Sequence, residues 1–174
     1  MKVQVSKLKH HPLNREIYSL SDIDDLTKSI KDVGLLQPLV VDQKNRVVSG
    51  NRRLESIRAL GIKTVTKEKV KVSDKDVGKL LVHHNKQRVK THRELLNEYH
   101  ILFKHYSIGS GKRTDLDPTF VSTGKGHNTR HLISDELGIS NTQIARLVFI
   151  EKENEELIEL IDKGILTINQ AYLQ

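Results

Sequence analysis

Two segments decide the fold of this chain: SIKDVGLLQPLVV at residues 29–41 and VVSGNRRLESIRALGI at residues 47–62. The first predicts a helix that ends at Gly34 and a short strand that begins after Pro38, because proline cannot donate to the ladder of a central strand. The second predicts a return strand through its two valines, which gives a hairpin. A helix that buries apolar residues at helical spacing is then expected after Gly50.

Outside these segments the apolar spacing is mixed in the first half of the chain and helical in the second. A valine-rich stretch at residues 65–72 predicts one more strand, and a helix is expected to follow from Ser73. Thr91, with Glu94 three residues later, predicts the start of another helix. Its expected buried stripe consists of Leu95, Tyr99, Leu102 and Tyr106.

The change of pattern predicts an α+β domain over residues 1–105 and an all-α domain over residues 129–174. Residues 106–128 are rich in Gly, Ser, Thr and basic residues without apolar periodicity, so a basic linker is expected there. A length of 174 residues with 36% hydrophobic residues allows two modest cores.

The composition narrows the class of partner. The net charge is +7, from 29 Lys+Arg against 22 Asp+Glu, and favours a polyanion. Aromatic residues make up only 4% of the chain and Trp is absent, which disfavours stacking on single strands and leaves duplex DNA as the expected partner. The chain has no Cys, no run long enough for a membrane span and no signal-peptide core in MKVQVSKLKHHP, so we expect a cytoplasmic protein.

Residues 130–150 predict a helix-turn-helix. Gly138 supplies the positive φ that a tight turn requires, and Ile133, Ile144 and Leu147 are expected to lock the two helices together. The side chains expected to face bases or phosphates in a major groove are Ser140, Asn141, Thr142, Gln143 and Arg146. An ordinary helical hairpin with a solvated polar face is the alternative.

Basic residues that precede this motif are expected on phosphates, which set the register of a reading helix. They are Lys112, Arg113, Lys125 and Arg130. Residues 151–162 are strongly acidic and predict a helix that faces away from DNA. A basic run also fits a solvated loop, so it supports the DNA interpretation without deciding it.

Gly50, followed by Arg52 and Arg53, predicts an anion site. Free backbone N–H groups, the positive end of a helix and two guanidinium forks would converge there. Taken alone, the pattern also fits a helix start with solvated arginines. Two further polar segments interrupt apolar surroundings, GLLQP at residues 34–38 and HHNKQR at residues 83–88.

In this order, and followed by a helix-turn-helix, the three segments resemble the boxes of the ParB family of chromosome and plasmid partition proteins. The resemblance implies a ParB/sulfiredoxin-like α+β domain that binds CTP, followed by the all-α DNA-binding domain. It implies that Gly34 and Gln37 border the base and sugar of CTP and that Asn85 lies at a Mg²⁺ ion. The full set of nucleotide-binding residues that it implies is Gly34, Gln37, Gly50, Asn51, Arg52, Arg53, Asn85 and Arg88.

Two residues depart from the family pattern. Asn51 stands where the family usually has Glu, which implies a rebuilt triphosphate loop or a preference for another nucleotide. His84 stands where the family has the acid associated with the metal and with hydrolysis, and a neutral imidazole is a poor ligand for Mg²⁺. We therefore expect CTP binding with weak or absent hydrolysis, and no catalytic residue is assigned.

The resemblance also implies a nucleoid-associated homodimer that reads an inverted DNA repeat and closes as a clamp. It implies a ParA-type ATPase as a partner. The expected role is partition, or regulation of transcription, on a plasmid, phage or chromosome. The family's C-terminal dimerisation domain is not seen before Gln174, so we expect a truncated chain. Two alternatives are an enzyme on the same fold, such as a DNA nuclease or an ATP-dependent phosphotransferase, and a plain repressor with a vestigial pocket. The nine histidines do not predict a metal site, because adjacent helical histidines point about 100° apart.

Overall fold

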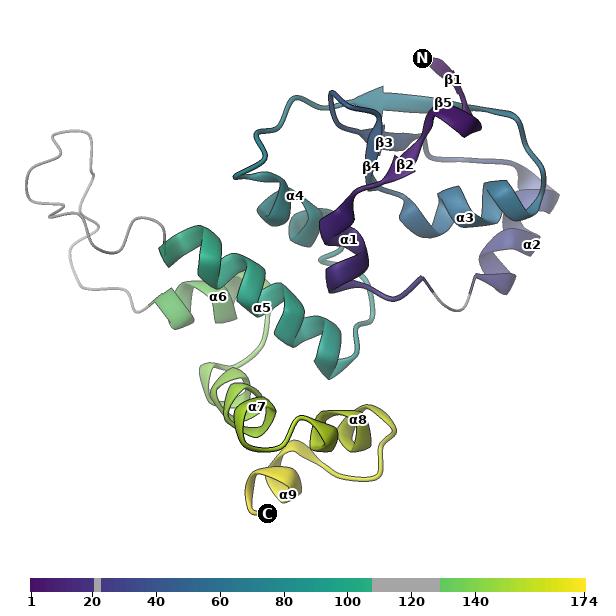
Figure 1. Ribbon diagram of the computed structural model, residues 1–174. Helices are drawn as coiled ribbons and strands as arrows, with labels where there is room; N and C mark the ends of the chain where they lie inside the picture. Colours follow the sequence, from purple (N-terminus) through teal and green to yellow (C-terminus); the bar gives the residue numbers. More distant parts are fainter. Residues whose placement is uncertain (21–22, 108–128) are drawn as a thin grey trace, which may run out of the picture. The chain divides into compact units, whose positions relative to one another are not determined.

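The chain divides into two compact units, Met1–Arg88 and Val89–Gln174. The computed structural model describes residues 1–20, 23–107 and 129–174 (Figure 1). The structure moves the expected domain boundary from residue 105 to Arg88, because α5 (His92–Ser107) packs on helices of the second unit and shares their apolar core. No helix in the described residues is long and apolar enough to cross a membrane.

Within its described residues, the first unit is built on a mixed five-stranded sheet in the order β1-β5-β3-β4-β2. The strands are β1 (Lys2–Gln4), β2 (Lys9–His10), β3 (Leu39–Val41), β4 (Arg46–Ser49) and β5 (Thr64–Lys69). The expected hairpin is confirmed as β3 and β4, while β3 runs parallel to β5. Both edge strands, β1 and β2, were not predicted, since two or three residues are too few to show an alternating pattern.

Helices cover this sheet and close its core. They are η1 (Val5–Lys7), α1 (Pro12–Ile17), α2 (Asp24–Val33), α3 (Asn51–Ala59) and α4 (Val77–His84). Figure 1 shows α2 beside α3, and the two helices are in contact. Leu54 and Ile57 of α3 are fully buried against Leu39, Val41 and Val47 of the hairpin. Burial of each such side chain stabilises the folded state by roughly 2 kcal/mol. The hairpin and α3 therefore share one apolar core.

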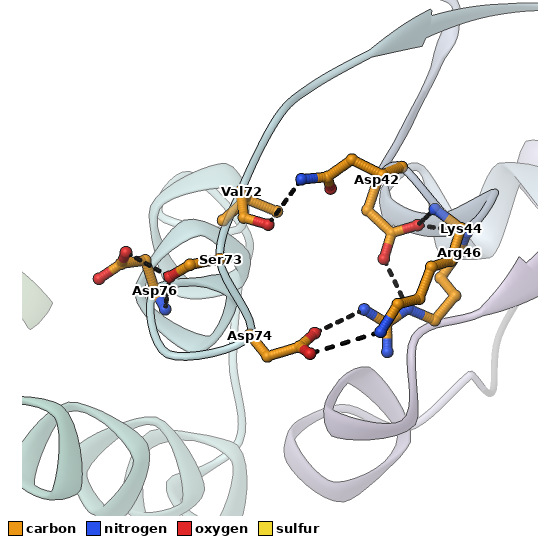
Figure 2. Close-up of polar contacts among 8 residues, drawn as sticks. Asp42, Lys44, Arg46, Val72, Ser73, Asp74 and Asp76 are labelled. Atoms are coloured by element: carbon orange, nitrogen blue, oxygen red, sulfur yellow. Dashed lines mark hydrogen bonds and ion pairs between the residues drawn. The ribbon is translucent and has the colours of Figure 1, made fainter.

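Asp42, fully buried at the end of β3, organises the hairpin turn. Its carboxylate accepts from the backbone N–H groups of Lys44 and Arg46, each at 2.8 Å, and from Arg46 Nε at 2.5 Å. Arg46 Nη2 also donates to Asp74 at 2.9 Å, and Lys44 Nζ lies 3.4 Å from the same carboxylate (Figure 2). This network joins the hairpin to the loop that leads into α4.

The described part of the second unit is helical. After α5 it contains α6 (Thr129–Leu137), α7 (Asn141–Glu153), α8 (Glu156–Asp162) and α9 (Ile168–Tyr172). Leu96, Tyr99 and Leu102 of α5 are buried, whereas Leu95 is only half-buried, so the expected stripe is shifted at its start. The acidic segment at residues 151–162 forms two helices rather than one, because the chain leaves helical geometry at Asn154, whose side chain accepts from the Glu156 N–H.

Candidate nucleotide and DNA sites

Gly50 forms the corner between β4 and α3. Its φ is +91°, in the left-handed region that favours glycine. A Cβ built there would lie 2.7 Å from Leu39 Cδ2 and 2.9 Å from Arg53 Nη2. Glycine is therefore required twice, for the backbone turn and for the close approach of these two side chains.

Arg53 connects two of the segments that the sequence analysis singled out. Its Nη1 donates to the backbone carbonyls of Gln37, at 2.7 Å, and Pro38, at 3.0 Å. Burial lowers the pKa of Arg53, yet an arginine stays protonated at neutral pH. The structure thus brings the turn after α2 against the start of α3, with a fixed positive charge between them.

The third segment lies at the end of α4, within electrostatic reach of this charge. Burial lowers the pKa of His84, and electrostatic interactions with His83 and Arg53 lower it further. His84 is therefore a neutral imidazole at pH 7. Asn85 caps the helix, and its Nδ2 donates to the Leu81 carbonyl at 2.8 Å.

Arg88 reaches a different part of the first unit. Its Nη2 donates to the Ser19 carbonyl at 3.3 Å, and its guanidinium lies 5.2 Å from the ring centroid of Tyr18. The expected nucleotide-binding residues therefore fall into two sets. One lies around Gly50, Arg53 and His84, and the other is Arg88, which contacts Ser19 and Tyr18.

Asn51, one of the two residues that depart from the family pattern, is buried inside the first unit. Its Oδ1 lies 2.7 Å from His10 Nδ1, and His10 Nε2 contacts the carboxylate of Glu55. Burial alone would raise the pKa of Glu55, but hydrogen bonds from His10 and Arg58 outweigh it, and the pKa is lowered. The Asn51 side chain thus holds the first turn of α3 to β2. This role of His10 was not predicted, because nothing in the sequence around His10 indicates a contact with a residue 41 positions away.

The residues at this corner suit an anion better than they suit a metal ion alone. Arg52 and Arg53 follow Gly50 at the helix start, where N–H groups and the helix dipole favour negative charge. No group of three His, Cys, Asp or Glu residues that could hold a metal ion is found in residues 1–20, 23–107 and 129–174. Asn85 Oδ1 offers one oxygen, so Mg²⁺ would need phosphate oxygens to complete its coordination.

The second unit has two helices, α6 and α7, with Gly138 between them, where the sequence predicts a helix-turn-helix. Gly138 has φ +71° between α6 and α7, and Ile133, Ile144 and Leu147 are buried as expected. Arg130 is half-buried in the first turn of α6. Lys112, Arg113 and Lys125, which were expected on phosphates, lie outside the described residues.

Four polar residues are exposed at the start of α7, Ser140, Asn141, Thr142 and Gln143, and the first and last of them cap the helix. Ser140 Oγ accepts from the Gln143 N–H at 3.1 Å, and Gln143 Oε1 accepts from the Ser140 N–H at 3.2 Å, which is a capping box. Asn141 and Thr142 are exposed beside it. Arg146 donates to Asn169 and lies 5.4 Å from the Tyr172 ring centroid, so α9 holds it.

Comparison with known proteins identifies the domain type of the first unit. Residues 1–85 match the ParB N-terminal domain family. The chain is 26% identical over 147 residues to the probable chromosome-partitioning protein ParB of Campylobacter jejuni, an alignment that covers 82% of this chain and 50% of that protein. The chain therefore spans about half the length of that relative.

Two solved structures share the fold. A pNOB8-like ParB-N domain matches with a TM-score of 0.68 and 17% identity, over 99% of this chain and 77% of that one. The C-terminally truncated chromosome-partitioning protein ParB of Caulobacter crescentus, complexed to the centromeric parS site, matches with a TM-score of 0.62 and 21% identity, over 99% and 82%. The α+β unit thus has a ParB-N fold. With the family match to residues 1–85, the first unit is a ParB N-terminal domain, and the chain as a whole is similar to ParB proteins.

Proposed function

We propose that this chain is a partition protein that binds CTP, with Mg²⁺, in its first unit and reads duplex DNA with the α6–α7 pair. The observation that carries the nucleotide part is the contact of Arg53 with Gln37 and Pro38 beside the start of α3. This contact brings the turn after Gly34 against the helix start at Gly50, and the charge of Arg53 also acts on His84, so a basic corner forms. Such a corner suits the negative charge of a triphosphate.

Each residue of this corner has a distinct part in the proposal. Gly34 and Gln37 border the base and sugar, Arg52 and Arg53 hold the triphosphate, and Asn85 offers its Oδ1 to Mg²⁺. Asn51 acts through its backbone at the first turn of α3, because its side chain is held by His10. Arg88 would take part only after leaving Ser19 and Tyr18.

Hydrolysis of the bound nucleotide is expected to be slow. His84 is neutral at pH 7 because burial lowers its pKa, so it supplies neither a carboxylate for the metal nor a strong base for water. The protein would then respond to nucleotide binding rather than to turnover.

The DNA part of the proposal rests on α7, whose start exposes Asn141, Thr142 and the amide nitrogen of Gln143. The Caulobacter relative is complexed to a parS site, and this likeness in fold supports duplex DNA as the partner here. A homodimer on an inverted repeat, and a ParA-type ATPase as a second partner, complete the proposal. A role in transcription on the same DNA element is compatible with it.

Calorimetry tests the nucleotide part directly. CTP, ATP and GTP are titrated with and without Mg²⁺ into the parent chain, into Arg52→Ala and into the charge-matched control Lys31→Ala. We expect CTP to bind the parent and Lys31→Ala equally and to bind Arg52→Ala more weakly. Equal binding to all three proteins would exclude Arg52 from the nucleotide site and contradict the proposed pocket. If no nucleotide binds, a repressor with a vestigial pocket is favoured.

A further inference from the structure

A second basic region lies in the first unit, apart from the corner at Gly50. Two pockets, of about 560 Å³ and about 610 Å³, share Arg58 and are therefore neighbours. Their lining residues come from the segment that runs from β1 to α1, from α3, and from the loop after α3 and the start of β5. None of the residues assigned above to the nucleotide lines either pocket.

The charge in these pockets is strongly one-sided. The four cationic residues that line them are Lys9, Arg15, Arg58 and Lys63, which together define the Arg58 groove. Glu16 is the one acidic residue among the lining side chains. The imbalance creates a positive potential, which a hollow surface concentrates.

Arg58 is held rigidly at the junction of the two pockets. Its Nη2 donates to the Leu8 carbonyl at 2.9 Å, and its Nη1 donates to Glu55 at 2.8 Å. Glu55 remains a carboxylate, because hydrogen bonds from His10 and Arg58 hold its pKa below the ordinary value despite burial. The Arg58 charge is thus largely balanced from inside the protein.

The surplus positive charge comes from the other three residues. Lys9, Arg15 and Lys63 are exposed, and none of them pairs with a carboxylate in the part of the chain that the structure describes. Their long side chains can converge on a ligand in the groove at no cost in broken ion pairs. Ser6 and Thr64 add hydroxyl groups to the lining of the larger pocket.

We propose that the Arg58 groove binds a ligand with two or more phosphate groups, separately from the nucleotide corner. Guanidinium, ammonium and hydroxyl groups are the donors that phosphate oxygens prefer. Several cations along a groove, rather than a single cradle, fit an extended anion. Free oligophosphates and the phosphodiester backbone of nucleic acid share this chemistry. The inference does not rest on the proposed CTP site.

The test uses the full chain and two matched triple variants. The groove variant is Lys9→Gln/Arg15→Gln/Lys63→Gln, and the control is Lys31→Gln/Lys69→Gln/Lys71→Gln, which removes the same charge at exposed lysines outside both pockets. Tripolyphosphate and a short duplex of scrambled sequence are titrated into each protein in an Arg52→Ala background, which weakens the proposed triphosphate site. Thermal unfolding verifies that both variants remain folded.

We expect the groove variant to lose at least about tenfold in affinity for one probe and the control to lose far less. For the duplex, the slope of log K against log salt should fall by roughly 0.9 for each lost contact. Loss with tripolyphosphate alone identifies a free oligophosphate, and loss with the duplex alone identifies a nucleic-acid backbone. Equal losses in both triple variants, or no binding of either probe, would overturn the proposal.

Discussion

Arg53 donates to the backbone carbonyl of Gln37 across a distance of 2.7 Å and so ties the start of α3 to the turn after α2. Gly50 makes this contact possible, because a Cβ there would lie 2.9 Å from Arg53 Nη2. One side chain therefore has two roles, a structural one within the first unit and a proposed electrostatic one toward a triphosphate.

Arg52→Ala and Arg53→Ala should both weaken CTP binding. Removal of Arg52 should weaken it by on the order of 2 kcal/mol. Removal of Arg53 should weaken binding and also lower the free energy of unfolding by about 2 kcal/mol, because two carbonyls lose a charged donor. Calorimetry with CTP and thermal unfolding measure the two effects. If Arg53→Ala unfolds like the parent, the bridge is not a stabilising contact.

His84→Glu should raise the rate of CTP hydrolysis above that of the parent. A carboxylate can ligate Mg²⁺ and orient water, whereas the imidazole of His84 is neutral at pH 7 because burial lowers its pKa. His84→Gln is the matched control, since it is polar and does not ionise. Phosphate release is the measurement, and brisk hydrolysis by the parent chain would show that another group activates the water.

Asp42→Asn should lower the free energy of unfolding by about 3 kcal/mol at neutral pH, because a buried carboxylate with three donors is lost. Burial raises the pKa of Asp42, but the hydrogen bonds from Arg46 and Lys44 outweigh this effect and lower it. The stabilisation is therefore present above the unfolded-state pKa of about 4 and disappears as pH falls below it.

Denaturant unfolding of the parent and Asp42→Asn at several pH values tests this prediction. The difference between the two proteins should shrink below about pH 4. Asp74→Asn is the control, since Asp74 is exposed and its loss should matter much less. A constant difference across the acid range would contradict an ionised Asp42 as the source of the stabilisation.

His11 should make the first unit sensitive to mild acid. It is 4% exposed, and neither ring nitrogen has a hydrogen-bond partner among the described residues. Burial lowers its pKa, and the nearby charge of Arg46 lowers it further. The unfolded chain therefore takes up a proton at a higher pH than the folded chain, and stability falls as pH drops below about 6.5.

NMR titration of the His11 ring should give a pKa below its ordinary value. His11→Leu should flatten the decline in unfolding free energy between pH 6.5 and the folded-state pKa. The control is His131→Leu, at an exposed histidine of the second unit. In this variant the free energy of unfolding of the first unit should fall with pH as it does in the parent. An ordinary pKa for His11 would show that the ring is hydrated and that the prediction is wrong.

The capping box refines what mutations in the proposed reading helix should do. Gln143→Ala should cost about 1 to 3 kcal/mol on a cognate duplex and also about 1 kcal/mol of stability, because Gln143 closes the cap with Ser140. Asn141→Ala should affect cognate binding without the stability loss. Arg146→Ala should loosen α9, since Arg146 contacts Asn169 and Tyr172.

Salt titrations on cognate and scrambled duplexes, after the site has been selected from random sequence, measure these effects. Helix variants should lose affinity mainly on the cognate duplex. Lys112→Ala and Arg113→Ala, in the segment expected on phosphates, should weaken both duplexes and reduce the salt slope by roughly one unit each. Equal losses on both duplexes for Asn141→Ala and Gln143→Ala would exclude α7 as the reading surface.

Local sequence determined the hairpin of β3 and β4, the ends of α2 and α3, and the two helices around Gly138. Each of these depends on neighbours within a few residues. Gly34 and Gly138 supply the positive φ at a helix end, Pro38 delays the strand, and Ser140 with Gln143 marks a helix start. These signals depend only on residues close together in the chain, so they can be read without the structure.

Only the tertiary structure decided where α5 packs, how β1 and β2 complete the sheet, and what the polar side chains contact. His10 and Asn51 are 41 residues apart, and their pairing removes the Asn51 side chain from the expected pocket. Arg53 and Arg52 look equivalent in the sequence, yet only the packing of α3 against the turn after α2 directs Arg53 onto Gln37 and Pro38. Such contacts depend on how separate elements pack, and packing between distant segments leaves no periodic pattern in the chain.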